Sequence, residues 1–218
     1  SLRLIDLNGN GRPDLLVSEE RAFCWYPSQG RKGYGPAQMA ETALSEEEGP
    51  AIVFTNPSES IVLADMTGDG LTDIVCIRNS SIVYWPNLGY GRFGAKVTMG
   101  DAPRFDHPDQ FDPGRVRLAD LDGSGPADLI YLGKDELYFW LNLGGNRWHH
   151  PHQTISPFPD VDDLSNVSVI DLLGTGTACV VWSSPLPTPV NRSIRYVDLM
   201  AGTKPYLLAS YENGMGRE

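Results

Sequence analysis

Short apolar runs separated by loops rich in glycine, proline and aspartate are the dominant pattern along this chain. Runs of this kind, bounded by turn-forming residues, are typical of β-strands. No stretch of helical length carries an apolar stripe with a period of 3.6 residues, and only residues 41–48 could form an acidic helical turn or two. The pattern therefore predicts an all-β fold.

One loop-and-strand motif occurs four times in the sequence. Its copies read DLNGNGRPDLLV, DMTGDGLTDIVC, DLDGSGPADLIY and DLLGTGTACVVW, and they start at Asp6, Asp65, Asp120 and Asp171. The starts are 59, 55 and 51 residues apart. A period of this size indicates an array of similar supersecondary units rather than one irregular core.

Each unit repeats the same order of predicted elements. One strand leads into the aspartate loop, a second strand leaves it, a third strand ends in an aromatic pair, and a glycine turn follows. First strands are expected at 2–6, 60–65, 115–120 and 166–171, and second strands at 15–18, 74–78, 129–132 and 178–183. The aromatic pairs are Trp25-Tyr26, Tyr84-Trp85 and Phe139-Trp140, and the glycine turns span 28–34, 87–93 and 142–148.

A variable fourth strand with a long exposed connection is expected in the less regular stretches 41–57, 100–113 and 156–165. About four strands per unit at this period predict an all-β, β-propeller-like array of about four blades, as a segment of a larger propeller. We expect a single propeller segment over 1–218 with repeat units at 1–56, 57–112, 113–163 and 164–218. The alternative is a flat β-sandwich. Closure of the four units on themselves, membership of a larger ring and pairing with a second copy are all compatible with the pattern.

The charge of the chain restricts its partners. The 28 acidic and 17 basic residues give a net charge of -11, which argues against nucleic acid and anionic membranes because both would repel the chain. Three bound divalent cations would bring -11 to -5, so part of the acidity could be ligand charge. No apolar run reaches about 18 residues and no leader sequence is visible, so we expect no transmembrane helix, no membrane insertion and no signal peptide.

The chain starts inside a predicted strand without an initiator methionine, and we expect a segment of a longer protein. The three cysteines, Cys24, Cys76 and Cys179, lie in apolar strand-like contexts. An odd number without motif spacing favours buried free thiols over a disulfide scaffold.

The aspartate loops carry oxygen side chains at positions one, three, five and nine, counted from the first aspartate. These are Asp6, Asn8, Asn10 and Asp14 in the first loop, Asp65, Thr67, Asp69 and Asp73 in the second, and Asp120, Asp122, Ser124 and Asp128 in the third. The position-seven carbonyls of Arg12, Leu71 and Pro126 are further candidate ligands. Six or more oxygens suit a hard cation, and Ca²⁺ tolerates irregular geometry. The sequence therefore predicts up to three structural Ca²⁺ sites.

The alternative to cation binding is that these oxygens form Asx-turns without any metal. The loop is not an EF-hand, because its carboxylate comes at position nine and its flanks are strands. The fourth copy keeps its glycines but has Leu173 and Cys179 at positions three and nine, so we expect it to bind no metal. The first loop has two carboxylates where the second and third have three, and we expect it to bind most weakly. A site closed by protein oxygens leaves no position to activate water, so the metal is expected to be structural.

Other candidate binding sites in the sequence also have purely structural explanations. His149, His150 and His152 could ligate a transition metal or form a proline-broken rim loop. The tryptophans could form a sugar-binding shelf or pack between blades. The remaining candidates are a solvated turn at Asp160, Asp162 and Asp163, and glycosylation acceptors that start at Asn79, Asn166 and Asn191.

The loop with its following strand resembles the FG-GAP/VCBS repeat of integrin-α-type propellers, whose loops bind calcium. Three longer strings, IVYWPNLGYGRFG (82–94), FDHPDQFDPGRVRLADLDGSGPADLIYLG (105–133) and KPYLLASYENGMG (204–216), resemble the middle region of the B component of insecticidal toxin complexes (Tc toxins) and SpvB-like proteins. The resemblance implies a propeller that docks the B–C cocoon onto the pore-forming A component and gates passage of the toxic fragment. Family propellers have more blades than the four units of this chain.

Three functional hypotheses follow from these patterns. The first is a non-enzymatic protein-binding propeller of a secreted bacterial toxin complex, whose partners are the A component and the rest of the B–C cocoon, with self-association of an incomplete propeller as a further possibility. The second is a calcium-dependent carbohydrate-binding or adhesion propeller. An enzyme is the third, and it is disfavoured because the sequence contains no Ser/His/Asp, Cys/His or open metal constellation.

Overall fold

A computed structural model describes residues 2–19, 22–40, 45, 47–50, 60–162, 164–186, 193–203, 206–208, 210–212 and 214. Within these ranges the regular elements are strands, apart from two 3-10 turns, η1 (Gly30–Lys32) and η2 (Pro113–Arg115). The predicted all-β fold is confirmed. Most of the expected acidic turn at 41–48 lies outside the described residues. No helix in the described part is long and apolar enough to span a membrane.

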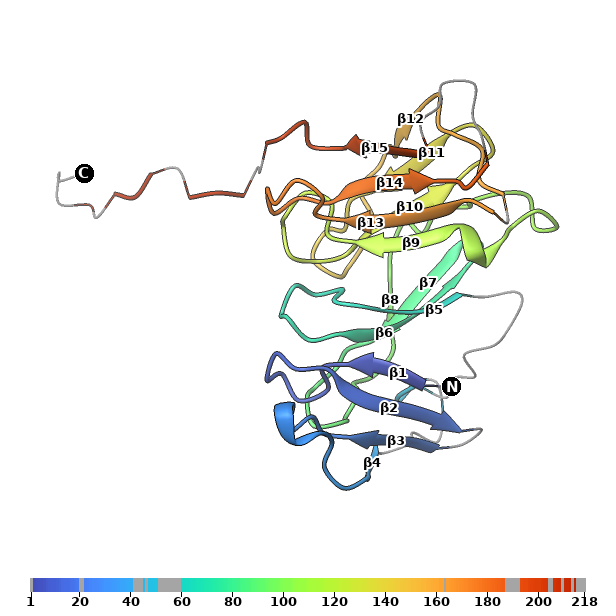
Figure 1. The fold of residues 1–218 in the computed structure, drawn as a ribbon. Helices are drawn as coiled ribbons and strands as arrows, with labels where there is room; N and C mark the ends of the chain where they lie inside the picture. The colour runs from blue at the N-terminus through green and yellow to red at the C-terminus, as the bar shows by residue number, and fades with distance from the viewer. Residues whose placement is uncertain are drawn as a thin grey trace. The chain divides into compact units, whose positions relative to one another are not determined.

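The strands form four antiparallel sheets, each made of strands that are consecutive in the chain (Figure 1). The first sheet contains β1 (Leu2–Ile5), β2 (Asp14–Glu19), β3 (Ala22–Tyr26) and β4 (Gln38–Ala40). The second contains β5 (Ser60–Ala64), β6 (Asp73–Arg78), β7 (Ser81–Trp85) and β8 (Val97–Thr98). The third contains β9 (Val116–Ala119), β10 (Asp128–Leu132), β11 (Leu137–Trp140) and β12 (Gln153–Ile155). The fourth contains β13 (Asn166–Ile170), β14 (Cys179–Ser183) and β15 (Ile194–Asp198).

This topology is that of propeller blades. Each repeat builds its own sheet, whereas a β-sandwich would combine strands from several repeats in one sheet. The predicted array of about four blade units is confirmed. The chain divides into two compact units, one with residues Ser1–Ala119 and Gly125–Asp160 and the other with Asp120–Ser124 and Val161–Glu218. The first three sheets belong to the first unit and the fourth sheet belongs to the second.

The aspartate loops are the connections of β-hairpins. In each of them the residue before position one pairs with the residue at position nine: Ile5 with Asp14, Ala64 with Asp73, Ala119 with Asp128, and Ile170 with Cys179. The same register holds in the fourth loop, where the position-nine aspartate is replaced by cysteine. The hairpin therefore forms with or without a carboxylate at that position.

The predicted position of the fourth strand is wrong. The sequence places it in 41–57, 100–113 and 156–165, but β4, β8 and β12 end before these stretches begin. The glycine turn brings the chain directly back beside the third strand, through the bridges Asn87–Phe93 and Asn142–Trp148. Because β8 and β12 are short and mostly exposed, they carry no apolar alternation that could have marked them.

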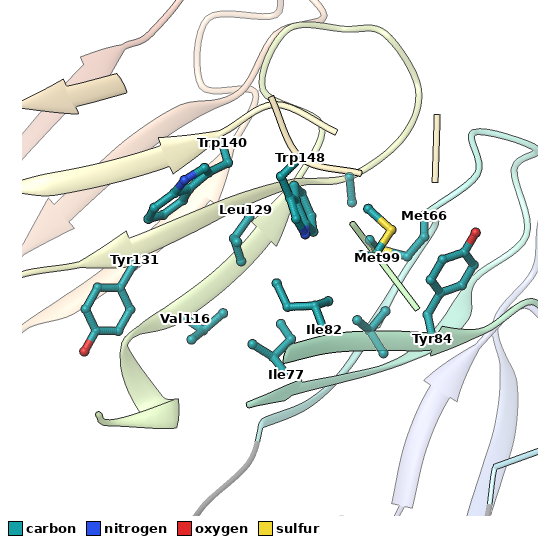
Figure 2. Close-up of a cluster of buried hydrophobic side chains, with 12 residues drawn as sticks. Met66, Ile77, Ile82, Tyr84, Met99, Val116, Leu129, Tyr131, Trp140 and Trp148 are labelled. Carbon is teal, nitrogen blue, oxygen red and sulfur yellow. The ribbon is translucent and has the colours of Figure 1, made fainter. Parts of the chain in front are cut away.

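The largest cluster of buried apolar side chains joins the second and third sheets (Figure 2). Its members are Met66, Val75, Ile77, Ile82, Tyr84, Met99, Val116, Ala127, Leu129, Tyr131, Trp140 and Trp148. The opposite face of the second sheet carries Ile74 and Trp85, and Leu63 and Phe93 on this side also pack against the first-blade cluster of Ile5, Leu7, Leu16 and Trp25. Both faces of β6 are therefore covered, and this explains its continuous apolar run, because a strand buried on one face only would alternate.

The glycine turn of the third blade makes a close backbone approach to the second blade. A Cβ atom on Gly145 would lie 2.7 Å from the hydroxyl of Tyr84 and 3.2 Å from the carbonyl oxygen of Met66. The Tyr84 hydroxyl donates a hydrogen bond to the Gly145 carbonyl at 3.0 Å. Gly144 has the same left-handed backbone, with φ of 63° against 77° for Gly145, but a Cβ there would meet nothing within 4 Å. Of these two glycines, only Gly145 combines left-handed backbone with a close neighbour.

These two glycines give a matched test of blade packing. We expect Gly144→Ala to lower the free energy of unfolding by about 1 kcal/mol, the cost of left-handed backbone for a residue with a Cβ. Gly145→Ala should cost about 2 kcal/mol more, because the new methyl group also displaces Tyr84 and the Met66 backbone. Urea unfolding of both variants measures the difference. Equal losses would contradict the close approach.

Candidate metal-binding loops

The aspartate at position one of each loop accepts hydrogen bonds from the amides of its own turn. In the first loop, Asp6 accepts from the amides of Gly9 at 2.9 Å and Gly11 at 2.6 Å. In the second, Asp65 accepts from Gly68 at 2.7 Å and Gly70 at 2.8 Å. Asp120 accepts from Gly123 at 2.8 Å and Asp171 accepts from Gly176 at 2.9 Å. The opening carboxylate therefore fixes the path of the turn in all four copies.

The aspartate at position nine is completely buried in the first three loops. Asp73 accepts the amide of Met66 at 2.9 Å on one oxygen and the amide of Asn87 at 2.8 Å on the other. Asp14 does the same with Leu7 at 3.1 Å and Ser28 at 2.6 Å. Position nine thus joins the aspartate loop to the glycine turn of the same blade.

An asparagine at the start of the glycine turn also bonds to the preceding blade. The Asn142 side-chain amide donates to the carbonyl of Met66 at 3.0 Å, in the second loop, and to that of Ala127 at 3.1 Å in its own loop. Asn87 repeats this arrangement with Asp6 at 3.4 Å and Thr72 at 3.1 Å. The sequence pattern predicts only a turn for these asparagines. The string NLG occurs at both 87–89 and 142–144, and this repetition is the sequence feature that could have indicated a second role for the asparagine, namely bonding to the preceding blade.

These hydrogen bonds correspond to the metal-free alternative, in which the loop oxygens form the turns. A carboxylate oxygen that accepts one amide keeps a second lone pair, so the bonds do not prevent cation binding. The loops differ in whether their carboxylates converge. Calcium binding by Asp6, Asn8, Asn10, Arg12 and Asp14, or by Asp65, Thr67, Asp69, Leu71 and Asp73, remains a prediction.

The third loop brings three carboxylates together. Oxygens of Asp120, Asp122 and Asp128 lie within 4.8 Å of one another, and Asp122 and Asp128 are buried. Two oxygens bound to the same Ca²⁺ are at most about 5 Å apart, so this spacing fits the ion. Ser124 and Pro126 lie in the same loop and would be the further ligands. The second loop has no comparable group among its described residues, and its third carboxylate, Asp69 at position five, is exposed.

Burial, together with the smaller effect of the neighbouring carboxylates of Asp65 and Asp69, raises the pKa of Asp73 to about 6. The amides of Asn87 and Met66 act in the opposite direction but do not cancel the effect of burial. A cation in the second loop would favour the ionised form of Asp73.

The positions of the tryptophan, cysteine and histidine side chains test three further predictions from the sequence. All five tryptophans are buried, so the blade-packing alternative is confirmed and an exposed tryptophan shelf for sugar is not formed. Cys76 and Cys179 are buried free thiols as expected, whereas Cys24 is only partly buried. His149, His150 and His152 are exposed and form no metal-binding group among the described residues.

The remaining polar motifs have local structural roles or lie outside the described part. The Asn79 side-chain amide, which a glycan would occupy, donates to the carbonyl of Asp106 at 2.8 Å. Asp162 accepts the amides of Leu164 and Ser165, as expected of a turn. Asp163 and Asn191 lie outside the described residues.

The repeated hairpin loops match a known repeat family. The FG-GAP-like repeat matches residues 6–76 and 65–131, which together cover more than half of the chain. The chain belongs to the FG-GAP-like repeat family. No curated protein sequence matches it.

Solved structures extend the similarity of this FG-GAP-like chain beyond the repeats. Over 89% of its length it is 28% identical to a chain of the Photorhabdus luminescens Tc holotoxin pore, with a TM-score of 0.71, and it covers 9% of that chain. It is 21% identical to TcdB2-TccC3 without the hypervariable C-terminal region, with a TM-score of 0.64, over 94% of this chain and 14% of that one. The expected resemblance to the propeller region of toxin-complex B components is confirmed.

The fold also occurs in a lectin. The chain is 22% identical to an Agrocybe aegerita lectin that recognises non-reducing terminal N-acetylglucosamine, with a TM-score of 0.62, over 82% of this chain and 45% of the lectin chain. At this level of identity the similarity extends to the fold alone.

The raised pKa of Asp73 predicts a pH dependence of stability in chelator-containing buffer. Between about pH 4 and pH 6 the folded state keeps a proton on Asp73 that the unfolded chain releases. The contribution of Asp73 to the free energy of unfolding is therefore present below pH 4 and is lost as the pH rises through 6, by roughly 3 kcal/mol at most. Urea unfolding of the wild type and Asp73→Asn from pH 4 to 7 measures it. We expect the wild type to lose more stability than the variant over this range, and parallel profiles would contradict the assignment.

Proposed function

We propose that this chain is a non-enzymatic, protein-binding propeller segment of a toxin-complex B component, which docks to the pore-forming A component and gates passage of the toxin. The observation that carries the proposal is the similarity to the Tc holotoxin over 89% of the chain at 28% identity. The chain spans 9% of that protein, so docking, gating and extracellular delivery are inferred from the resemblance of one region. The matched toxin regions belong to the propeller and shell rather than to a catalytic domain, which supports a binding role.

Exposed apolar side chains at the glycine turns supply a candidate docking surface. Leu88 is 55% exposed and Tyr90 is 73% exposed at the turn of the second blade, and Leu143 is 40% exposed at the turn of the third. Tyr90 also has a φ of 55°, which is uncommon for a residue with a large side chain. A bulky aromatic group held exposed on constrained backbone is typical of a contact residue. We therefore assign docking of the A component to the glycine turns of the second and third blades.

Capture of the A component by the full-length protein that contains this chain tests the proposal. We expect the wild type to bind, and Leu88→Ser with Tyr90→Ser to weaken binding by about tenfold or more, as expected for loss of an aromatic anchor. Met39→Ser is the control, because Met39 is 69% exposed on β4 outside the turns. Failure of the folded wild type to bind would overturn docking. Equal effects of the two variants would overturn this location for it.

The second part of the proposal is that Ca²⁺ stabilises the loops, with the third loop as the strongest site. Its support is the convergence of Asp120, Asp122 and Asp128. An ion at about a hundred times its dissociation constant would raise the free energy of unfolding by about 2.7 kcal/mol, since it binds only the folded state.

Thermal unfolding with Ca²⁺ and with chelator tests this role. We expect Ca²⁺ to raise the melting temperature, and Asp122→Asn to remove a substantial part of the increase. Asparagine can still accept the Ser124 amide that Asp122 accepts at 2.9 Å, so the variant removes charge while the turn is preserved. Asp171→Asn, in the fourth loop, should leave the response to Ca²⁺ unchanged. A wild-type melting temperature that is the same in both buffers would exclude the metal role.

A further inference from the structure

We propose that a pocket beside β11 binds a small planar aromatic carboxylate. The pocket has a volume of about 300 Å³ and lies between β11, the segment 103–105 and the stretch 150–152. Its side chains are mainly the aromatic Phe105, Tyr138 and Trp140 and the basic Arg104, His150 and His152. A volume of this size is at the lower limit of small-molecule sites, so the pocket has room for a single ring system. The site does not depend on the proposed toxin function.

The aromatic side chains form rigid walls of the pocket. The ring of Phe105 stands nearly perpendicular to that of Trp140, at an angle of 87° and a centre-to-centre distance of 5.8 Å. The ring centre of His152 lies 5.3 Å from that of Trp140 and 5.5 Å from that of Tyr138. Trp140 is itself part of the core between the second and third sheets (Figure 2). Ring faces and edges at this spacing favour a flat aromatic ligand over an aliphatic one.

The second blade holds one wall of the pocket in place. The Asn79 side chain accepts the Phe105 amide at 2.9 Å and donates to the Asp106 carbonyl at 2.8 Å. The Ser80 amide donates to the Pro103 carbonyl at 3.1 Å. Because both residues belong to the turn between β6 and β7, this wall is fixed before any ligand binds. A preformed pocket loses less conformational entropy on binding than one that the ligand must order.

The histidine stretch supplies a second wall. The His150 Nε2 atom lies 3.0 Å from the Asp101 carbonyl oxygen, and because a carbonyl can only accept, Nε2 is the donor. This bond fixes the orientation of the His150 ring. His149 is exposed and is not among the side chains that line the pocket. The HHPH motif therefore contributes two of its three histidines, His150 and His152, to the site.

The pocket is basic although the chain is acidic. The net charge of the chain is -11, yet none of the described residues that line the pocket is acidic, and Arg104 contributes a positive charge. An arginine can bind both oxygens of one carboxylate. The Tyr138 hydroxyl donates to the Glu136 carboxylate at 2.5 Å, and this bond raises the pKa of Tyr138 to about 12. The phenol therefore stays neutral and does not repel an anion.

An NMR titration of the isotope-labelled 218-residue chain with benzoate and with indoleacetate tests the ligand class. We expect at least one acid to shift the Phe105 and Trp140 amide signals saturably, with a dissociation constant of about 1 mM or lower. The Trp25 amide signal, in the first blade, should not move. The neutral amide of the same acid should bind at least about tenfold more weakly, because it lacks the charge that pairs with Arg104. Absence of saturation by both acids at about 10 mM, or equal binding of acid and amide, would overturn the proposal.

Two matched pairs of variants locate the site. Arg104→Gln should weaken binding of the acid by at least about tenfold, whereas Arg31→Gln, at an exposed position in η1, should leave it unchanged. His152→Ala should weaken binding by at least about fivefold through the lost ring contact, and His149→Ala should not. The neutral sugar N-acetylglucosamine should not displace the acid. Equal effects within either pair, or displacement of the acid by the sugar, would contradict the assignment.

Discussion

The buried carboxylate at position nine is the interaction on which the other features of each of the first three blades depend. A carboxylate removed from water must be hydrogen-bonded, and here its oxygens accept backbone amides. In Asp73 one oxygen holds the aspartate loop and the other holds the glycine turn. In the second and third blades this turn also presents its asparagine to the preceding blade. A contact made inside one blade therefore supports the packing of one sheet on the next.

The sequence was sufficient for the elements and their repetition but not for their long-range bonding. The pairing of Ile5 with Asp14 and of Ile170 with Cys179 follows from the position of the loop between two apolar runs. The bond from Asn142 to Met66 joins residues 76 positions apart, and no local pattern encodes such a partner. The fourth strands were misplaced because β8 and β12 are too short and exposed to show a period.

The candidate metal sites illustrate a second limit. The same side-chain oxygens can accept amides or bind a cation, so their spacing in the sequence does not distinguish the two uses. By number of carboxylates, the second and third loops are equivalent. In the structure the carboxylate at position three, Asp122, is buried, as is Asp128, whereas the carboxylate at position five, Asp69, is exposed. The second and third loops therefore differ in where the third carboxylate stands in the loop, although both have the same number of carboxylates.

The asparagine bonds between blades have a fixed direction along the chain. Asn87 donates to Asp6 in the loop before it, and Asn142 donates to Met66 in the loop before it. The acceptor always precedes the donor, so during synthesis from the N-terminus each new blade meets a neighbour whose loop has already been made. These asparagine bonds therefore allow assembly to proceed blade by blade as the chain leaves the ribosome.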